Sequence, residues 1–303
     1  MRALSPPPLQ PGDRIGIAAP GGPIRREPFD RGVAYLEARG FRPVFGESVA
    51  RRHAYLAGTD DERLADLSAF VSDPGIRAIW CARGGYGSPR IVAGLDLAPL
   101  RRHPKALIGY SDITALHAAV FRKLRLATWH GPHVSELGDP ALFDEPSLWK
   151  ALSGDAKDLA WPLPASSVHR AGVGEGTLLG GCLSLLVALV GTPYETPLDG
   201  AVLFWEEVNE EPFRIDRMLC HLRLAGRLRN LRGMVVGRLV GCVAKDPQNE
   251  MPLREILQTH LAGTDYPVVT DFPAGHCPAK TTLPLGRTVR LDTGALRLAV
   301  SGR

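Results

Sequence analysis

One short stretch of sequence decides the fold of this chain: ALIGYSD, at residues 106–112. Its first four residues are apolar or small, as in a strand buried on both faces of a parallel sheet. Ser111 and Asp112 follow at once, and an amphipathic helical pattern through Leu116 and Phe121 begins directly behind them. A strand that turns sharply into a helix exposes the side chain at the turn. The stretch therefore predicts an α/β fold that presents a serine at the end of a strand.

The residues around this stretch repeat the alternation of strand and helix. Apolar runs at 14–19 and 76–80 predict buried strands, and glycine-rich turns follow both. A helical pattern follows the first turn, and Thr59 with Glu62 matches a capping box that opens a second helix. Strands and helices that alternate over short connections form a parallel sheet covered on both faces. We therefore expect residues 1–140 to form a Rossmann-like N-terminal domain with a nucleophile elbow.

The second half of the chain has a more mixed pattern. Between residues 141 and 174 the periodicity fades while Pro, Ser, Asp and Gly accumulate, and we expect a linker there. Residues 175–303 are expected to form a mixed, β-rich C-terminal α/β domain. Its last residues alternate around an Asp-Thr-Gly turn, which predicts a hairpin. Strands are predicted at 201–205 and 234–241, and helices at 212–224 and 253–260.

The composition excludes several classes of protein. The 303 residues are 45% hydrophobic and 22% charged, which is typical of a soluble globular chain of about two domains. The formal net charge is +4 and the basic residues stand in scattered pairs, so nucleic acid is not an expected partner. No apolar run approaches the roughly 18 residues that cross a bilayer, and no signal peptide is visible. Five cysteines without a CxxC pair suit reduced thiols and a cytoplasmic location.

Two segments at strand ends carry the candidate chemistry of the N-terminal domain. Ser111 has the position of a nucleophile, although Ile113 replaces the last glycine of G-x-S-x-G and a plain helix cap is the alternative. The backbone N–H of Asp112 is a candidate to stabilise an oxyanion. Gly84 and Gly85 follow the neighbouring strand, where a glycine lets a second N–H approach the reacting oxygen. A glycine-rich turn without function is the alternative there, and the phosphate-binding glycine patterns are absent.

A serine nucleophile needs a base, and the histidines are the candidates. His276 lies in a loop after an apolar strand. His130 and His133 resemble a metal pair, but the Gly-Pro between them breaks a helix and H-E-x-x-H is absent, so no metal site is expected. Glutamates at 206–207 and 210–211 form an acidic cluster at a strand end. A carboxylate that orients a histidine, a solvated acidic loop and a glycosidase pair all remain open for it.

Taken together, these segments resemble the LD-carboxypeptidase family of serine peptidases, which includes the microcin C self-immunity peptidases. The resemblance covers nearly the whole chain in order. The matching segments are AAPG at 18–21, AGTD at 57–60, ARGGYG at 82–87, IGYSD at 108–112, HGP at 130–132, GTL at 176–178, EEVNEEPF at 206–213, GH at 275–276 and LPLG at 283–286.

The resemblance implies a Ser-His-Glu triad divided between the two domains. Ser111 would be the nucleophile, His276 the base and Glu206 the carboxylate that orients the base. Two positions depart from the family pattern: Cys182 stands where Asn is common, and Glu207 where Asp is commoner. The first departure implies that a hydrogen bond of the substrate pocket is missing or replaced.

The resemblance also implies a substrate and a cellular role. The expected reaction is hydrolysis of the bond between meso-diaminopimelate and the terminal D-Ala of murein tetrapeptides, in peptidoglycan recycling. The enzyme would be a cytoplasmic homodimer without a cofactor, and Arg83 is a candidate to meet the carboxylate of the peptide. A microcin C-type peptidase that cleaves peptidyl-nucleotides is one alternative. A non-catalytic murein-fragment binding protein is another.

Overall fold

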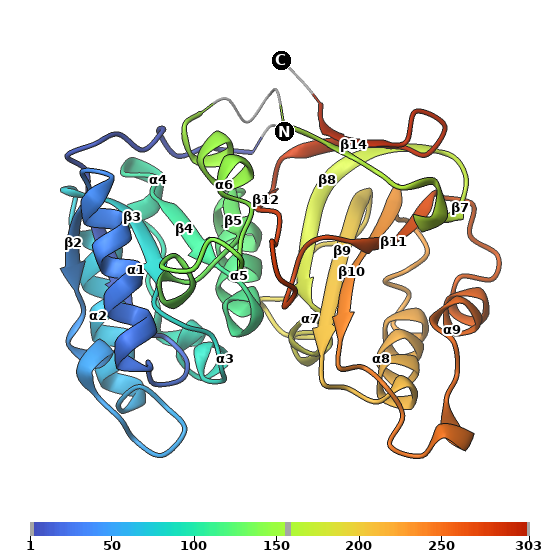
Figure 1. The fold of residues 1–303 in the computed structure, drawn as a ribbon, viewed down its shortest axis with the longest axis horizontal. Helices are drawn as coiled ribbons and strands as arrows, with labels where there is room; N and C mark the ends of the chain where they lie inside the picture. The colour runs from blue at the N-terminus through green and yellow to red at the C-terminus, as the bar shows by residue number, and fades with distance from the viewer. Residues whose placement is uncertain (1–2, 155–158, 302–303) are drawn as a thin grey trace. The chain divides into compact units, whose positions relative to one another are not determined.

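The chain divides into two compact units in the computed structural model, which describes residues 3–154 and 159–301 (Figure 1). The first unit comprises Met1–Ala156 together with Pro278–Gly286. The second comprises Lys157–Cys277 and Arg287–Arg303. The chain therefore leaves the first unit, returns to it for nine residues after Cys277, and ends in the second unit.

The first unit is built on a six-stranded sheet in the order β12-β5-β4-β3-β1-β2. Strand β12 pairs antiparallel with β5, whereas the other neighbouring pairs are parallel. The direction of winding reverses between β1 and β3, and ligands of open α/β sheets bind at the carboxyl ends of the strands beside such a reversal. The strands are β1 (Arg14–Ala18), β2 (Arg42–Phe45), β3 (Ile76–Cys81), β4 (Ala106–Gly109), β5 (Thr128–His130) and β12 (Leu283–Leu285).

Helices connect the parallel strands of this sheet, and α1 lies across one of its faces (Figure 1). The capping box predicted at Thr59 and Glu62 is confirmed at the start of α2. At the end of α1, Gly40 has a φ of 82° and closes the helix with its neighbour Phe41 through bonds to Glu37 and Leu36. The helices are α1 (Arg26–Ala38), α2 (Asp60–Ser72), α3 (Ser88–Ile91), α4 (Pro99–Arg102), α5 (Thr114–Leu124) and α6 (Glu145–Leu152).

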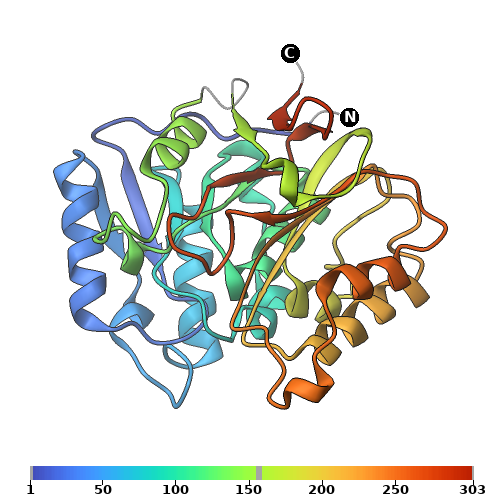
Figure 2. The ribbon, with the colours of Figure 1, turned by 45° about the vertical axis from the view of Figure 1, so that its right-hand side comes forward.

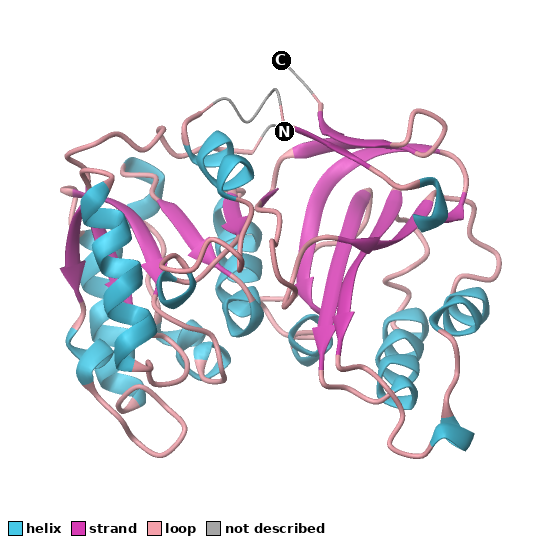
Figure 3. Ribbon diagram, viewed as in Figure 1, coloured by secondary structure: helices cyan, strands magenta, loops and turns pink. Residues whose placement is uncertain are grey.

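The second unit is built on an eight-stranded mixed sheet, in the order β6-β14-β13-β8-β9-β10-β11-β7 (Figure 3). Its centre, β8 to β11, is parallel, and antiparallel strands flank it on both sides. Helices α8 and α9 lie side by side (Figure 2). The elements are β6 (Ala160–Pro162), β7 (Val168–Arg170), β8 (Val173–Cys182), α7 (Leu183–Ala188), β9 (Ala201–Val208), α8 (Pro212–Leu224), β10 (Gly233–Val240), α9 (Leu253–His260), β11 (Val268–Phe272), β13 (Thr288–Asp292) and β14 (Arg297–Val300).

The predicted α/β class and the mixed second sheet are confirmed, as is the hairpin that β13 and β14 form. The segment 141–174 contains regular structure, namely α6, β6, β7 and the start of β8, while its residues 155–158 lie outside the described part. Short strands of three residues carry no alternation that a sequence pattern can detect. Among the described residues, no helix is both long and apolar enough to cross a bilayer.

Candidate active site

Ser111 stands at the turn from strand β4 into the helix that follows it. Its φ is 62°, in the left-handed region that residues with a side chain rarely adopt. Holding a serine there costs on the order of 1–3 kcal/mol, so the surrounding structure must impose the turn. A Cβ on Gly109 would lie 2.9 Å from Cγ1 of Ile113, so only glycine lets the strand pass this close to the helix. The backbone has the form of a nucleophile elbow.

The glycine loop after β3 lies against this serine. A Cβ on Gly84 would lie 3.1 Å from the Cβ of Ser111 and 3.3 Å from its Oγ. The carbonyl of Gly84 accepts the N–H of Gly22 at 2.8 Å, so a hydrogen bond joins the loop after β1 to the loop after β3. Gly85 has a φ of 102°, which glycine adopts without strain. The two glycines that the sequence singles out therefore lie beside Ser111, at the carboxyl ends of adjacent strands.

The side chain of Asp112 binds the end of the glycine loop that follows β3. Its buried carboxylate accepts the N–H of Ser88 at 2.8 Å and the N–H of Gly87 at 3.1 Å. Burial raises the pKa of Asp112, and these hydrogen bonds and the charge of Arg63 act in the opposite direction. Arg63 is itself buried, and its guanidinium binds the carbonyl of Pro20. The local sequence predicts a helix cap or an oxyanion N–H at Asp112, but no local pattern shows where a carboxylate will be buried.

Glu206 and His276 form a carboxylate–imidazole pair in the second unit. Oε2 of Glu206 lies 2.7 Å from Nδ1 of His276 and accepts the backbone N–H of His276 at 3.2 Å. The side chain of Glu206 is 0% exposed and that of His276 is 18% exposed. Gly275 leaves room for this contact, since a Cβ there would lie 2.5 Å from Oε2. A carboxylate at Nδ1 fixes the proton on that nitrogen, which makes Nε2 the basic one.

Glu207, the next residue of β9, makes a different set of contacts. Its carboxylate accepts the N–H of Ser184 at 2.8 Å, and the Sγ of Cys182 donates to Oε1 at 3.3 Å. Burial raises the pKa of both Glu207 and Cys182, so the thiol remains protonated and serves as the donor. Where the family pattern often has Asn, this chain thus places a thiol hydrogen-bonded to Glu207.

The other candidates of the acidic cluster lie near basic side chains. Glu210 lies 3.5 Å from Arg214, and Glu211 lies 3.6 Å from Lys245.

His133, one of the two histidines that resemble a metal pair, is buried, and its Nε2 lies 3.1 Å from the backbone carbonyl oxygen of Tyr110. In residues 3–154 and 159–301, no three His, Cys, Asp or Glu side chains are grouped so as to hold a metal ion.

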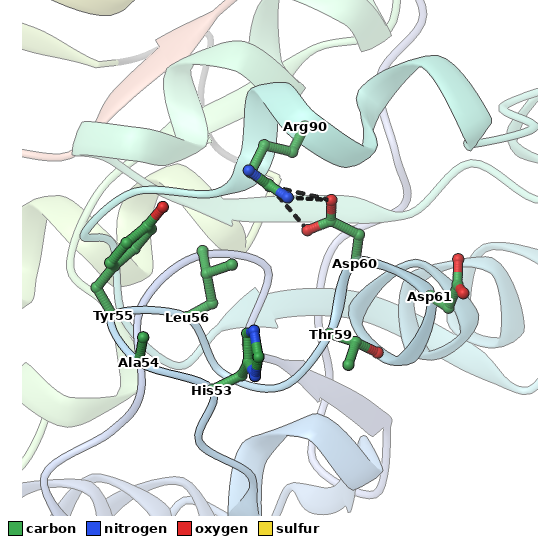
Figure 4. Close-up of a pocket in the computed structure, with 8 residues that line it drawn as sticks. All are labelled: His53, Ala54, Tyr55, Leu56, Thr59, Asp60, Asp61 and Arg90. Carbon is green, nitrogen blue, oxygen red and sulfur yellow. Dashed lines mark hydrogen bonds and ion pairs between the residues drawn. The ribbon is translucent and has the colours of Figure 1, made fainter.

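A cavity of about 430 Å³ lies elsewhere in the first unit, around the start of α2 (Figure 4). Arg90 and Asp60 face each other on its wall, with Nε of Arg90 2.9 and 3.0 Å from the two carboxylate oxygens. Ser111, Gly84 and Gly85 are not among its lining residues. Those are His53, Ala54, Tyr55, Leu56, Thr59, Asp60, Asp61 and Arg90.

Comparisons with known proteins assign both units to one family. Residues 15–131 match the family model of the LD-carboxypeptidase N-terminal domain, and residues 175–291 match that of the LD-carboxypeptidase C-terminal domain. The chain belongs to the LD-carboxypeptidase family, and it is an enzyme of the serine peptidase class.

Three known proteins illustrate the similarity. A probable murein peptide carboxypeptidase of Bacillus subtilis is 36% identical over 95% of this chain and 91% of its own length. A murein tetrapeptide carboxypeptidase of Pseudomonas aeruginosa is 32% identical over 94% of both chains. The structure of MccF, the microcin C7 self-immunity protein of Escherichia coli, in complex with glutamyl sulfamoyl guanosine matches with a TM-score of 0.91, 26% identity and 99% coverage of both chains.

Proposed function

We propose that this protein is a serine carboxypeptidase that removes the terminal D-Ala of murein tetrapeptides by cutting its bond to meso-diaminopimelate. The observation that carries the proposal is the left-handed Ser111 packed against Gly84 at the end of β4. A strained serine at a strand-to-helix turn is the arrangement by which a nucleophile elbow exposes its serine for acyl transfer. The murein relatives, which are more than 30% identical to the chain, support the choice of substrate.

The proposed mechanism uses three side chains. Nε2 of His276 takes the proton of Ser111 while Oγ attacks the amide carbonyl carbon, and Glu206 holds the imidazole in the required tautomer. The oxyanion accepts the N–H of Asp112 and a second N–H from Gly84 or Gly85. The C–N bond then breaks and His276 returns the proton to the amine of D-Ala.

Hydrolysis of the acyl-enzyme completes the cycle. His276 takes a proton from a water molecule, whose oxygen attacks the ester carbonyl carbon. The C–O bond to Ser111 then breaks, and His276 gives its proton to Oγ of Ser111. In this scheme the nucleophile belongs to the first unit and the other two residues to the second. Arg83, whose guanidinium donates to the carbonyl of Pro23 at 2.8 Å, is our candidate to meet the terminal carboxylate.

The substrate is tested by mass spectrometry of the purified protein incubated separately with a murein tetrapeptide and with a peptidyl sulfamoyl nucleotide. We expect the tetrapeptide to lose one D-Ala, both with and without a metal chelator. An unchanged tetrapeptide together with a cleaved nucleotide conjugate would favour the immunity-type reaction, which the similarity to MccF makes the second candidate. No cleavage of either compound would contradict both proposed substrates.

The proposal extends to location and assembly. Murein tetrapeptides are recovered inside the cell in recycling, so we propose a cytoplasmic enzyme, and by resemblance to the family we propose a homodimer. Light scattering coupled to size exclusion would give about twice the chain mass of 32.7 kDa for a dimer. A mass of one chain at micromolar concentration would contradict it.

A further inference from the structure

An ion pair between buried Lys280 and Glu136, whose side chain is 16% exposed, lies next to the residue before Ser111. Lys280, whose side chain is 3% exposed, places Nζ 2.8 Å from Oε1 of Glu136 and 2.6 Å from the carbonyl oxygen of Leu142. The hydroxyl of Tyr110 donates to the same Oε1 at 2.8 Å. Since Tyr110 directly precedes Ser111, a single carboxylate links the lysine to the residue before the nucleophile.

His133 extends this group to the glycine loop. Its ring stacks on Tyr110 with a centroid separation of 4.4 Å, and its backbone N–H donates to Oε2 of Glu136 at 2.9 Å. The same ring is near Gly84, since a Cβ on Gly84 would lie 3.1 Å from Cε1 of His133. We call Tyr110, His133, Glu136 and Lys280 the elbow support. Through Tyr110 it adjoins Ser111, and through the ring of His133 it lies near Gly84.

The electrostatics of the elbow support keep Glu136 charged. Burial acts to raise the pKa of Glu136, but the hydrogen bonding of His133 and the charge of Lys280 outweigh it and hold that pKa well below its usual range. Nζ of Lys280 also lies 5.3 Å from the ring centroid of Tyr110, within the range of a cation–π contact. Removal of one member of a buried ion pair leaves the charge of the other without a partner, which is costly. Glu136 and Lys280 therefore hold each other in place.

Lys280 differs from the other members in where it comes from. It lies in Pro278–Gly286, the segment by which the chain returns to the first unit. There the N–H of Ala279 donates to the carbonyl of Ala141 at 2.8 Å, and strand β12 pairs with β5 a few residues later. His276 is four residues earlier, which is about 14 Å of fully extended chain at most. The segment that follows the proposed base is therefore fastened to the residue that precedes the proposed nucleophile.

We propose that Lys280 is a positioning residue for catalysis. By holding Glu136 it fixes Tyr110, so that Ser111 keeps its left-handed backbone, and it anchors the chain that leaves His276. This inference rests on the proposed function, because it assigns to Lys280 an effect on the reactivity of Ser111. A merely structural role would lower the stability of the fold without changing the turnover of the folded molecules.

The test compares two buried lysines of the first unit. Lys105 is the matched control, because its Nζ donates to the carbonyls of Asp73 at 2.7 Å and Ile76 at 2.9 Å, at the end of the sheet where β3 and β4 begin. We expect Lys280→Met and Lys105→Met both to lower the melting temperature. Only Lys280→Met should lower kcat for D-Ala release and the rate of Ser111 labelling by a serine-directed phosphonate, each about 10- to 100-fold. KM should change little.

A double variant separates positioning from stability. Glu136→Gln with Lys280→Met removes both charges, so it should recover much of the lost stability. Labelling of Ser111 should stay as slow as in Lys280→Met, because the contacts of Lys280 with Glu136 and Leu142 are still missing. Equal labelling and kcat in Lys280→Met and Lys105→Met, or labelling that recovers together with stability in the double variant, would overturn the role of Lys280.

The wild-type protein distinguishes this failure from failure of the proposed function. A wild type that is labelled at Ser111 and releases D-Ala, beside an equally active Lys280→Met, overturns only the role of Lys280. A wild type that is neither labelled nor active overturns the proposed function and the role of Lys280 with it.

Discussion

Gly84 shows how closely the proposed site is packed at the level of single residues. A methyl group there would lie 3.1 Å from the Cβ of Ser111 and 3.1 Å from the ring of His133, which is tighter than ordinary contact. Gly84→Ala should therefore displace the serine or the loop by a few tenths of an ångström and lower kcat about 10- to 100-fold. Steady-state kinetics of D-Ala release measure this.

The control for that substitution is Gly294→Ala, because a Cβ on Gly294 would meet Oδ1 of Asp292 at 3.6 Å, which is ordinary contact, and no closer atom of the described residues beyond its two chain neighbours. Its kcat should equal that of the wild type. Full activity in Gly84→Ala would show that catalysis does not require the close packing of residue 84 against Ser111.

Glu206 is buried and holds His276 through two contacts with one oxygen. Glu206→Gln preserves the size of the side chain but removes the charge that stabilises a protonated imidazole. We expect kcat to fall by roughly 10²- to 10⁴-fold with little change in the melting temperature. Glu210→Gln, near a surface arginine, should keep wild-type kcat. Comparable losses in both variants would remove Glu206 from the proposed triad.

At the level of elements, helix α5 carries a histidine that makes the fold sensitive to acid. Nε2 of His117 lies 2.9 Å from the carbonyl of Gly109, the last residue of β4. Burial lowers the pKa of His117 to about 3, although that hydrogen bond opposes the shift. In the unfolded chain the pKa returns to about 6.5. Protonation therefore favours unfolding as the pH falls from 6.5 towards 3.

This linkage predicts a measurable loss of stability. Between pH 7 and pH 5, His117 should cost about 2 kcal/mol of unfolding free energy. Urea denaturation at the two pH values measures it, and His117→Gln should reduce the loss by that amount because glutamine does not titrate. An unchanged pH dependence in the variant would mean that the pKa of His117 is the same in the folded and the unfolded chain.

The elements that the sequence predicts well are those with a strong local signal. The capping box of α2 and the limits of α8 and α9 agree with the structure, because capping residues, a first-turn proline and apolar periodicity act within a few residues. Strand β12 has three residues with a proline at its centre, and its partner β5 lies more than 150 residues earlier. Such a pairing leaves no local pattern, so sequence reasoning missed it.

The same distinction holds for the candidate site. Ser111, Gly84 and Gly85 follow strand ends, and their proximity within one sheet could be expected from topology. The contact of Glu206 with His276 was expected only through the family resemblance, since 70 residues separate them. The elbow support was not foreseen, because His133, Glu136 and Lys280 carry no motif and meet only when β12 joins the first sheet.

At the level of the whole molecule, the chain divides its proposed chemistry between two units. The first holds a strained serine beside a braced glycine loop, and the second holds a buried carboxylate bonded to a histidine. Neither set alone performs acyl transfer, since a serine needs a base and a base needs a nucleophile. The central claim is therefore that Ser111 is the nucleophile of a carboxypeptidase.

The most direct measurement is the rate of D-Ala release from a murein tetrapeptide by the wild type, by Ser111→Ala and by Ser153→Ala as a control. Ser153 is exposed, and its hydroxyl donates to the carbonyl of Lys150 at 3.3 Å. The account predicts release by the wild type and by Ser153→Ala at equal rates, and a loss of at least about 10³-fold in Ser111→Ala. Release of D-Ala at an undiminished rate by Ser111→Ala would contradict it.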